Sequence, residues 1–366
     1  MRRELCFPMS ADRVTGLVLD AGLEGLGALV SSSGRSRVFL VADERALSFW
    51  GDELDLELSG LEQAGRLLIR AEEAAKTVRT LESAWMAMRQ AGLRRSADAV
   101  VCFGGGLVCD VGALAASTYL RGLPLILVPS TLLCQVDACL GGKTAVNLGD
   151  AKNQLGTFYP AESVWIATRL LATLEPGHFR GGLGEALKTS LVGDASIAAG
   201  LLARVPGAGE PGFEDWASSL VERCLRVKGA IVTEDLLETG RRVLLNAGHT
   251  LGHALESASG FGLTHGEAVA AGLVLEARMA ELLEGSAPGL SLELAGMLPG
   301  LGIGFAGLSR SPGALADFLE RDKKTGRGGQ RTWVLPFGWE DCRPTLLSPS
   351  EESRLLGSLL EEDAAW

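Results

Sequence analysis

The chain has 366 residues, of which 47% are hydrophobic and 22% charged, and its formal net charge is −11. This balance is typical of a globular protein with one large domain or two ordinary ones and a sizeable core. The negative charge argues against nucleic-acid binding, and no run of about 18 uncharged apolar residues indicates a membrane-spanning helix.

Strands and helices alternate in the first half of the predicted structure. Short apolar runs predict buried parallel strands, and one of them leads into Gly104-Gly105-Gly106 and a small-residue helix that begins near Leu107. This alternation predicts βαβ units and a parallel sheet. The predicted strands are 37–43, 97–103 and 124–129, and a helix is predicted over 72–93.

The pattern changes near Pro176, after which long helical segments dominate. We therefore predict a Rossmann-like, nucleotide-binding α/β domain at 1–175 and a mainly helical domain at 176–366, with the active site in the cleft between them. The predicted later elements are helices at 184–192, 216–233, 247–259 and 267–283, a strand at 331–336, and a last helix at 349–362.

The seven cysteines are odd in number and form no C-x-x-C pair. Several of them lie in apolar surroundings, where cysteine behaves as a small hydrophobic residue. The N-terminus M-R-R-E-L-C-F-P also lacks an apolar signal core. These features predict a reduced, cytoplasmic protein.

Three of the four histidines lie in one short window. His249 and His253 are four residues apart, so a helix would present both on one face. Thr264 and Glu267 form a T-x-x-E capping box, which predicts a helix start with His265 in its first turn. A lone histidine is more simply interpreted as a polar core residue. A cluster of three indicates a metal site, because imidazole is the commonest metal ligand.

Two further regions suggest ligand binding. A glycine triplet between a strand and a helix is often only a turn, but together with Ser130-Thr131 after the next strand it favours a dinucleotide site. The glycine-rich segments G-G-K-T-A-V-N and K-N-Q-L-G hold Lys143 and Lys152, which are either solvated surface lysines or donors for an anionic ligand. Glu185 and Lys188 are three residues apart and can form a surface ion pair on one helix face. Alternatively, Glu185 is the carboxylate that completes the metal site.

Taken together, these segments resemble the 3-dehydroquinate synthase family of the sugar phosphate cyclases, over nearly the whole length from about residue 35. The resemblance rests on the order and spacing of the segments E-E-A-A-K (72–76), G-G-G-L-V-C-D (104–110), T-Y-L-R-G (118–122), P-S-T-L-L-C-Q-V-D (129–137), G-G-K-T-A-V-N, K-N-Q-L-G-T-F-Y-P, G-E-A-L-K, E-T-G-R-R-V-L-L-N-A-G-H-T-L-G-H-A-L-E (238–256), T-H-G-E-A-V and R-D-K-K (321–324).

The resemblance implies a role for each matching residue. The metal, zinc or cobalt, is expected on Glu185, His249 and His265, and a histidine that contacts substrate or relays a proton is expected at His253. Arg121 corresponds to an arginine that reaches the substrate phosphate of the neighbouring subunit, which implies a homodimer. The remaining catalytic or substrate-binding residues are expected to be Asp137, Lys143, Asn153, Lys188, Lys228, Arg242, Asn246 and one lysine of Lys323-Lys324, with Lys324 preferred. The expected NAD+ contacts are Asp43, Glu73, Lys76, Gly105, Gly106, Asp110, Ser130, Thr131, Lys143, Lys152 and Thr173.

The implied activity is that of a carbon–oxygen lyase of the shikimate pathway to the aromatic amino acids. It converts 3-deoxy-D-arabino-heptulosonate 7-phosphate to 3-dehydroquinate and phosphate by transient oxidation with NAD+, phosphate elimination, reduction and intramolecular aldol cyclisation. Three alternatives stay open: a cyclase for another sugar phosphate, a metal-dependent polyol or alcohol dehydrogenase of the same fold, and a non-catalytic binding protein. Arg242, Asn246 and His253, together with Lys323-Lys324, favour the dehydroquinate reaction.

Overall fold

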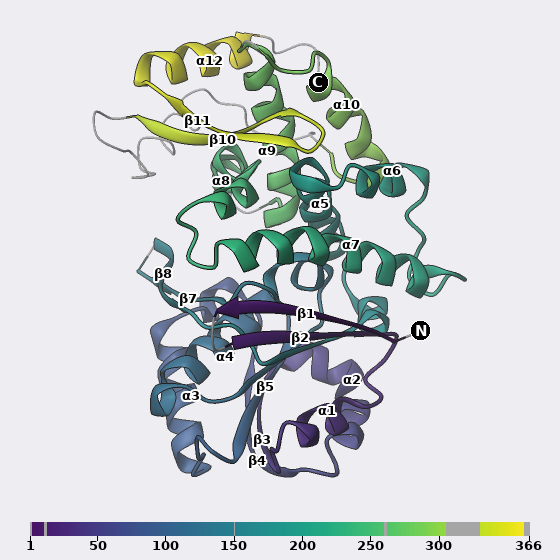
Figure 1. Cartoon of the computed structure of the whole chain (residues 1–366), viewed down its shortest axis with the longest axis vertical. Helices are drawn as coiled ribbons and strands as arrows, with labels where there is room; N and C mark the ends of the chain where they lie inside the picture. The colour runs from purple at the N-terminus through teal and green to yellow at the C-terminus, as the bar shows by residue number, and fades with distance from the viewer. Residues whose placement is uncertain are drawn as a thin grey trace. The chain divides into compact units, whose positions relative to one another are not determined.

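The computed structural model describes residues 2–10, 13–149, 151–259, 262–283, 285–304 and 330–361. The chain forms two compact units (Figure 1). The first unit comprises Met1–Glu175 and Pro206–Leu237, and the second comprises Pro176–Val205 and Glu238–Trp366.

The first unit is built on a sheet that has seven strands in the described residues, in the order β1-β2-β9-β6-β5-β3-β4. β1 and β2 form an antiparallel hairpin, and every other neighbouring pair is parallel. β5 and β6 are buried at every position, which explains their uninterrupted apolar sequences. The strands are β1 (Arg3–Ser10), β2 (Arg13–Asp20), β3 (Arg37–Asp43), β4 (Glu62–Ile69), β5 (Asp98–Gly104), β6 (Leu125–Pro129) and β9 (Ser163–Ala167). The three predicted strands are confirmed as β3, β5 and β6.

Helices cover both faces of this sheet. Figure 1 shows α1 (Leu26–Ser32) and α2 (Glu44–Glu57) on one side of the parallel strands, with α3 (Val78–Gln90) and α4 (Gly106–Thr118) on the other. Leu26, Leu40 and Leu54 belong to one buried cluster that joins α1 and α2 to the sheet. The helix predicted at 72–93 is shorter in the structure, because the Thr77 side chain accepts the Thr80 N–H at 3.2 Å and caps α3 at that point.

A second, smaller sheet of the first unit was not predicted. β7 (Lys143–Leu148) and β8 (Ala151–Phe158) pair antiparallel, and β8 is exposed along most of its length. Short helical turns complete the unit: η1 (Glu73–Ala75), η2 (Tyr119–Arg121), a π-helical turn η3 (Cys134–Ala138) and η4 (Thr168–Thr173).

The second unit is mainly helical, as predicted, and α9 (His265–Glu281) lies at its centre. Trp333, Leu355 and Met279 belong to a buried cluster in which α9 packs against the later strands and the last helix. The predicted helices at 247–259 and 267–283, the strand at 331–336 and the last helix at 349–362 are confirmed with small shifts at their ends, whereas the helix predicted at 184–192 begins eight residues earlier, at Pro176. The elements are α5 (Pro176–Gly193), α6 (Ser196–Ala203), η5 (Arg241–Asn246), α8 (His249–Ala258), α9, α10 (Leu290–Met297), η6 (Leu298–Leu301), β10 (Arg331–Gly338), β11 (Asp341–Leu347) and α12 (Pro349–Glu361).

Helix α7 (Phe213–Glu234) lies in a different unit from the predicted one. The predicted boundary assigns it to the second domain, but Pro206–Leu237 belongs to the first unit. The physical reason is that the buried face of α7 packs on β1, β2 and the turns η3 and η4, and these contacts are not visible in the local sequence. The boundary at Glu175 coincides with the predicted one, and the expected active site in a cleft between domains stays a prediction. Within the described residues, no helix has the length and apolar composition needed to cross a membrane.

Candidate active site

The three clustered histidines lie together at the starts of two helices. His249 is the first residue of α8, His253 follows one turn later, and His265 is the first residue of α9. Their ring centroids are 5.3–5.4 Å apart, and ring nitrogens of all three lie within 4.8 Å of one another. The predicted capping box is confirmed, because the Glu267 carboxylate accepts the Thr264 N–H at 2.9 Å.

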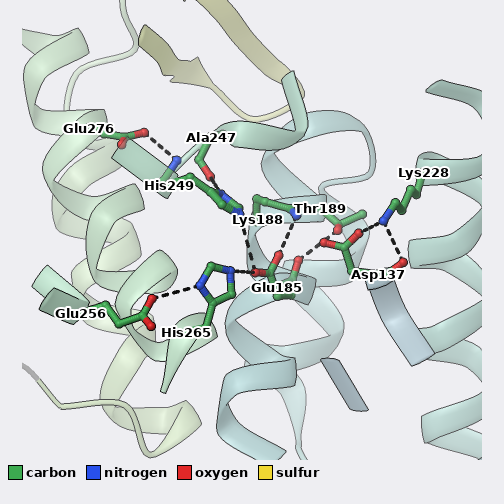
Figure 2. Close-up of polar contacts among 11 residues, drawn as sticks. Asp137, Glu185, Lys188, Thr189, Lys228, Ala247, His249, Glu256, His265 and Glu276 are labelled. Atoms are coloured by element: carbon green, nitrogen blue, oxygen red, sulfur yellow. Dashed lines mark hydrogen bonds and ion pairs between the residues drawn. The ribbon is translucent and has the colours of Figure 1, made fainter. Parts of the chain in front are cut away.

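Glu185 extends from α5 toward two of these histidines. Figure 2 shows the His249 and His265 rings directed at its carboxylate. Glu185 Oε1 lies 3.3 Å from His265 Nε2 and 3.9 Å from His249 Nε2. The other oxygen lies 2.6 Å from Lys188 Nζ, and both side chains are only 2% exposed. The ion pair is therefore a buried one, and the position of Glu185 beside the two histidines is compatible with a role as a metal ligand.

The far nitrogens of both rings have partners of their own. His249 Nδ1 lies 3.1 Å from the Ala247 carbonyl oxygen, and His265 Nδ1 lies 3.2 Å from Glu256 Oε2. Such bonds fix the tautomer and leave Nε2 as the ligand atom. Two imidazole nitrogens and one carboxylate form a donor set that suits zinc or cobalt with an open position for substrate. The residues present therefore fit a catalytic metal ion.

The electrostatics of the site suit this donor set. Burial lowers the pKa of His249 to about 3, which keeps the ring neutral, as a metal ligand must be. Burial opposes the charge of Glu185, but Lys188 and His265 hold its pKa well below the usual range, so it is a carboxylate. Burial also opposes the charge of His265, yet hydrogen bonds to Glu185 and Glu256 raise its pKa to about 9. A metal ion would therefore displace a proton from His265 at neutral pH.

Several of the residues expected to bind NAD+ lie at or directly after the carboxyl ends of neighbouring strands. Asp43 ends β3, Gly104 ends β5, and Ser130, whose N–H donates to the Gly104 carbonyl at 2.9 Å, follows β6. After β3 the chain continues to β4 on one side, and after β5 it continues to β6 on the other side. The position between β3 and β5 is therefore a topological switch point of the sheet. A Cβ on Gly105 would lie 2.9 Å from Thr131 Cγ2, and α4 begins directly after it. Such a helix start suits a phosphate.

A polar network beside this edge joins three distant segments of the first unit. Lys76 Nζ lies 2.7 Å from Asp110 Oδ2 and donates to Asn153 Oδ1 at 2.5 Å. Asn147 links the network to Glu73, donating to Oε1 at 2.7 Å, and accepts the Asn153 N–H at 2.9 Å. The structure therefore brings together Glu73, Lys76, Asp110 and Asn153. Asn147 is not among the residues predicted to contact NAD+ or substrate.

The remaining predicted residues of the first unit differ in their surroundings. Lys228 donates to the Asp137 carbonyl oxygen at 2.7 Å and forms an ion pair with its carboxylate. Arg121 is exposed, in a loop where Leu120 and Arg121 have φ values of 50° and 63°. Lys143 and Lys152 are exposed on β7 and β8. Gly106 is the first residue of α4. The Thr173 hydroxyl accepts the Trp50 indole N–H at 2.9 Å.

In the second unit, Arg242 and Asn246 lie on the turn η5. Arg242 is 1% exposed, and Asn246 Nδ2 donates to Glu238 Oε1 at 2.8 Å. Lys323 and Lys324 lie outside the described residues. Glu256 and Glu238, which contact His265 and Asn246, are not among the predicted site residues. The one sequence signal for Glu256 is its position on the same helix as His249.

Comparison with known proteins shows that the fold is that of the sugar phosphate cyclases. A 2-epi-5-epi-valiolone synthase from Streptomyces hygroscopicus subsp. jinggangensis, solved with NAD+ and Zn2+, is 28% identical, with a TM-score of 0.81 over 95% of this chain and 97% of that one. A 2-deoxy-scyllo-inosose synthase solved with carbaglucose-6-phosphate, NAD+ and Co2+ has a TM-score of 0.84 over 97% and 99% of the two chains, at 24% identity.

Within this class the chain belongs to the 3-dehydroquinate synthase family. The N-terminal family model of 3-dehydroquinate synthase matches residues 66–181, and the C-terminal model matches 182–325. A 3-dehydroquinate synthase from Enterococcus faecalis is 35% identical over 319 residues, which cover 86% of this chain and 87% of that one. The predicted family is confirmed, and the two solved structures named above contain NAD+ together with Co2+ or Zn2+.

Proposed function

We propose that this protein is a 3-dehydroquinate synthase, a carbon–oxygen lyase that converts 3-deoxy-D-arabino-heptulosonate 7-phosphate to 3-dehydroquinate and phosphate. The observation that carries the proposal is the convergence of Glu185, His249 and His265, with the far side of each ring held by its own acceptor. Family membership supplies the reaction, and cysteines that form no disulfide bond favour the cytoplasm, where thiols stay reduced.

When bound, the metal ion supplies Lewis-acid polarisation of a substrate hydroxyl, and NAD+ accepts and returns a hydride. Glu185, His249 and His265 hold the ion. Lys188 Nζ lies 2.6 Å from Glu185 and is buried, so it offers a fixed positive charge to a substrate oxygen. His253 stands beside the two ligand rings, where it can hold or pass a proton.

The remaining residues bind the anionic substrate and the dinucleotide. Arg242 is suited to a carboxylate or phosphate because its guanidinium is fork-shaped and is held almost fully out of solvent. Asp137, Lys143, Asn153, Lys228, Asn246 and Lys324 are the other proposed substrate contacts. The strand ends at Asp43, Gly105, Gly106, Ser130 and Thr131, with Glu73, Lys76, Asp110, Lys152 and Thr173, form the proposed NAD+ site.

The activity is tested with purified protein, NAD+, Zn2+ or Co2+, and the heptulosonate phosphate. We expect phosphate release, 3-dehydroquinate as the product, and many turnovers without accumulation of NADH, because the hydride returns to its donor carbon. Prior chelation should abolish turnover, and added Zn2+ or Co2+ should restore it. Stoichiometric NADH would instead identify a dehydrogenase. Turnover of another sugar phosphate, with none of the heptulosonate, would identify a different cyclase.

We also propose a homodimer in which Arg121 binds the phosphate of the neighbour's substrate. The exposed position of Arg121 supports this, because its side chain is open to a second copy of the chain. The test mixes Arg121→Ala subunits with Lys188→Ala subunits, each inactive as a homodimer. Mixed dimers should regain about one working site, since both defects fall in the same composite site. If mixed dimers form without any rescue, Arg121 acts within its own chain or has no role.

A further inference from the structure

The helix that carries His249 begins without a cap from its own sequence. The N-cap residue of α8 is Gly248, at a φ of 76°, and it has no side chain to accept the first N–H groups. Serine, threonine, aspartate or asparagine usually fills this position and stabilises a helix by about 1 kcal/mol. His249 is the next residue, so any looseness in this turn would move a proposed metal ligand.

Glu276, from α9, supplies the missing cap. One of its oxygens accepts the Gly248 N–H at 2.5 Å, and the other accepts the Leu251 N–H at 3.0 Å. The side chain is fully buried, at 0% exposed. The two bonds lie on either side of His249 in the sequence, and Figure 2 shows Glu276 directed at the start of α8. A carboxyl group that accepts two N–H groups at a helix start satisfies two backbone donors that would otherwise have no partner inside the helix.

The close packing of the two helices explains why the cap comes from another element. A Cβ on Gly248 would lie 2.7 Å from both the Val269 carbonyl oxygen and Leu273 Cγ, so no capping side chain fits there. A Cβ on Gly272 would lie 2.1 Å from the Gly248 carbonyl oxygen, so the two backbones meet at this point. Glu276 follows Gly272 by one helical turn on the same face of α9, which places its carboxylate over the start of α8.

We infer that Glu276 is a positioning residue that fixes His249 relative to His265. His265 begins α9, the helix that also carries Glu276, and Glu276 holds the turn of α8 from which His249 extends. One rigid helix thus sets the position of both imidazoles. The inference rests on the proposed metal site and identifies a residue that supports it without touching the ion.

The chain contains a matched control for this role. Glu281 lies on the same helix and also caps a helix that starts after a glycine, α10 after Gly289. Its carboxylate accepts the Ser291 N–H and the Ser291 hydroxyl, each at 2.8 Å. α10 carries no histidine and none of the proposed site residues. A substitution at Glu281 therefore reproduces the loss of a helix cap without affecting the proposed site. An effect on metal binding is expected only from substitutions at Glu276.

The experiment measures Co2+ binding by the full-length protein without substrate. Glu276→Gln, Glu276→Asp, Glu281→Gln and wild type are compared by chelator competition, by the visible spectrum of bound Co2+, and by hydrogen exchange at residues 248–251. Glu276→Gln should weaken Co2+ binding by about tenfold to a hundredfold, shift the Co2+ bands and speed exchange in this turn. Glu276→Asp keeps the carboxyl group with a shorter reach and should fall between Glu276→Gln and wild type. Glu281→Gln should match wild type in affinity and spectrum.

Wild-type affinity and spectrum in folded Glu276→Gln would overturn the inference, as would an equal loss of affinity in Glu281→Gln. If Glu276→Gln does not fold, Glu276→Asp decides on the same two readouts. Failure of the proposed function can be told apart from failure of this inference. If only the proposed function fails, the wild type binds Co2+ through His265 but forms no 3-dehydroquinate, and the Glu276 variants still weaken Co2+ binding. A wild type that binds no Co2+ would overturn both.

Discussion

The proposed metal site and the proposed dinucleotide site are held in place by different means. Glu185 and the histidines extend from three packed helices of the second unit, and each ligand atom has a buried or hydrogen-bonded support behind it. The network of Lys76, Asn147 and Asn153 instead joins a short turn to a largely exposed two-stranded sheet of the first unit.

The difference concerns how much each site depends on single residues. In the helical site every ligand position is fixed by packing, so one lost ligand leaves an ion with too few donors. In the polar network each residue has several partners, and water can replace some of them at the exposed sheet. Substitutions in the first region should therefore abolish function, and those in the second should weaken binding by degrees.

The largest effect is expected for His265→Ala. Loss of one of three ligands should remove the metal ion and lower kcat by about a thousandfold or more, because metal polarisation supplies several kcal/mol and each 1.36 kcal/mol is about a factor of ten. Metal content by elemental analysis and steady-state kinetics provide the test. Full metal content with wild-type turnover would remove His265 from the site.

A smaller effect is expected for Glu256→Ala, which removes the acceptor behind His265. The ring would lose its fixed orientation, so metal affinity should fall by about tenfold to a hundredfold while saturating metal restores most of the activity. Chelator competition measures the affinity. An unchanged affinity would mean that packing alone orients His265.

In the first unit, Lys76→Met should raise KM for NAD+ by about tenfold to a hundredfold. The lysine makes a charge-assisted bond to Asp110, and such bonds contribute about 1.5–3 kcal/mol. Metal content should stay at the wild-type level, which serves as the control. A variant that lost its metal but kept its KM for NAD+ would contradict the separation of the two sites.

The smallest effects are expected from two helix-cap variants, one in each unit. Thr77→Ala and Thr264→Ala should each lower the free energy of unfolding by about 1 kcal/mol. Thr264→Ala should also weaken metal binding by less than about tenfold, because His265 follows directly. Thr77→Ala should leave metal binding unchanged. Denaturant unfolding and Co2+ titration measure both quantities, and a metal defect in Thr77→Ala would argue against a local effect.

Local patterns predicted much of this molecule. The spacing of His249 and His253, the capping box before His265 and the apolar runs of β3, β5 and β6 are each contained within a few residues, and the structure has all of them. Helix geometry converts such spacings directly into shared faces.

The interactions that the sequence did not reveal join distant segments. Glu276 reaches Gly248, 28 residues away in sequence, and Asn147 reaches Glu73, 74 residues away. The exposed strand β8 has no alternation of buried and exposed positions to mark it, and α7 has an amphipathic sequence that does not specify its partner. These contacts depend on tertiary packing, which overrides local preference.

The buried thiols of the first unit bear on how the protein takes up its metal ion. Zinc and cobalt bind thiolate well, but burial raises the pKa of Cys102 and Cys139, so these sulfurs keep their protons. Cys134 likewise stays protonated beside Cys109, at an Sγ–Sγ distance of 3.8 Å. These cysteines therefore compete poorly for zinc or cobalt, so the protein's own buried thiols should not divert the ion from the proposed site on Glu185, His249 and His265.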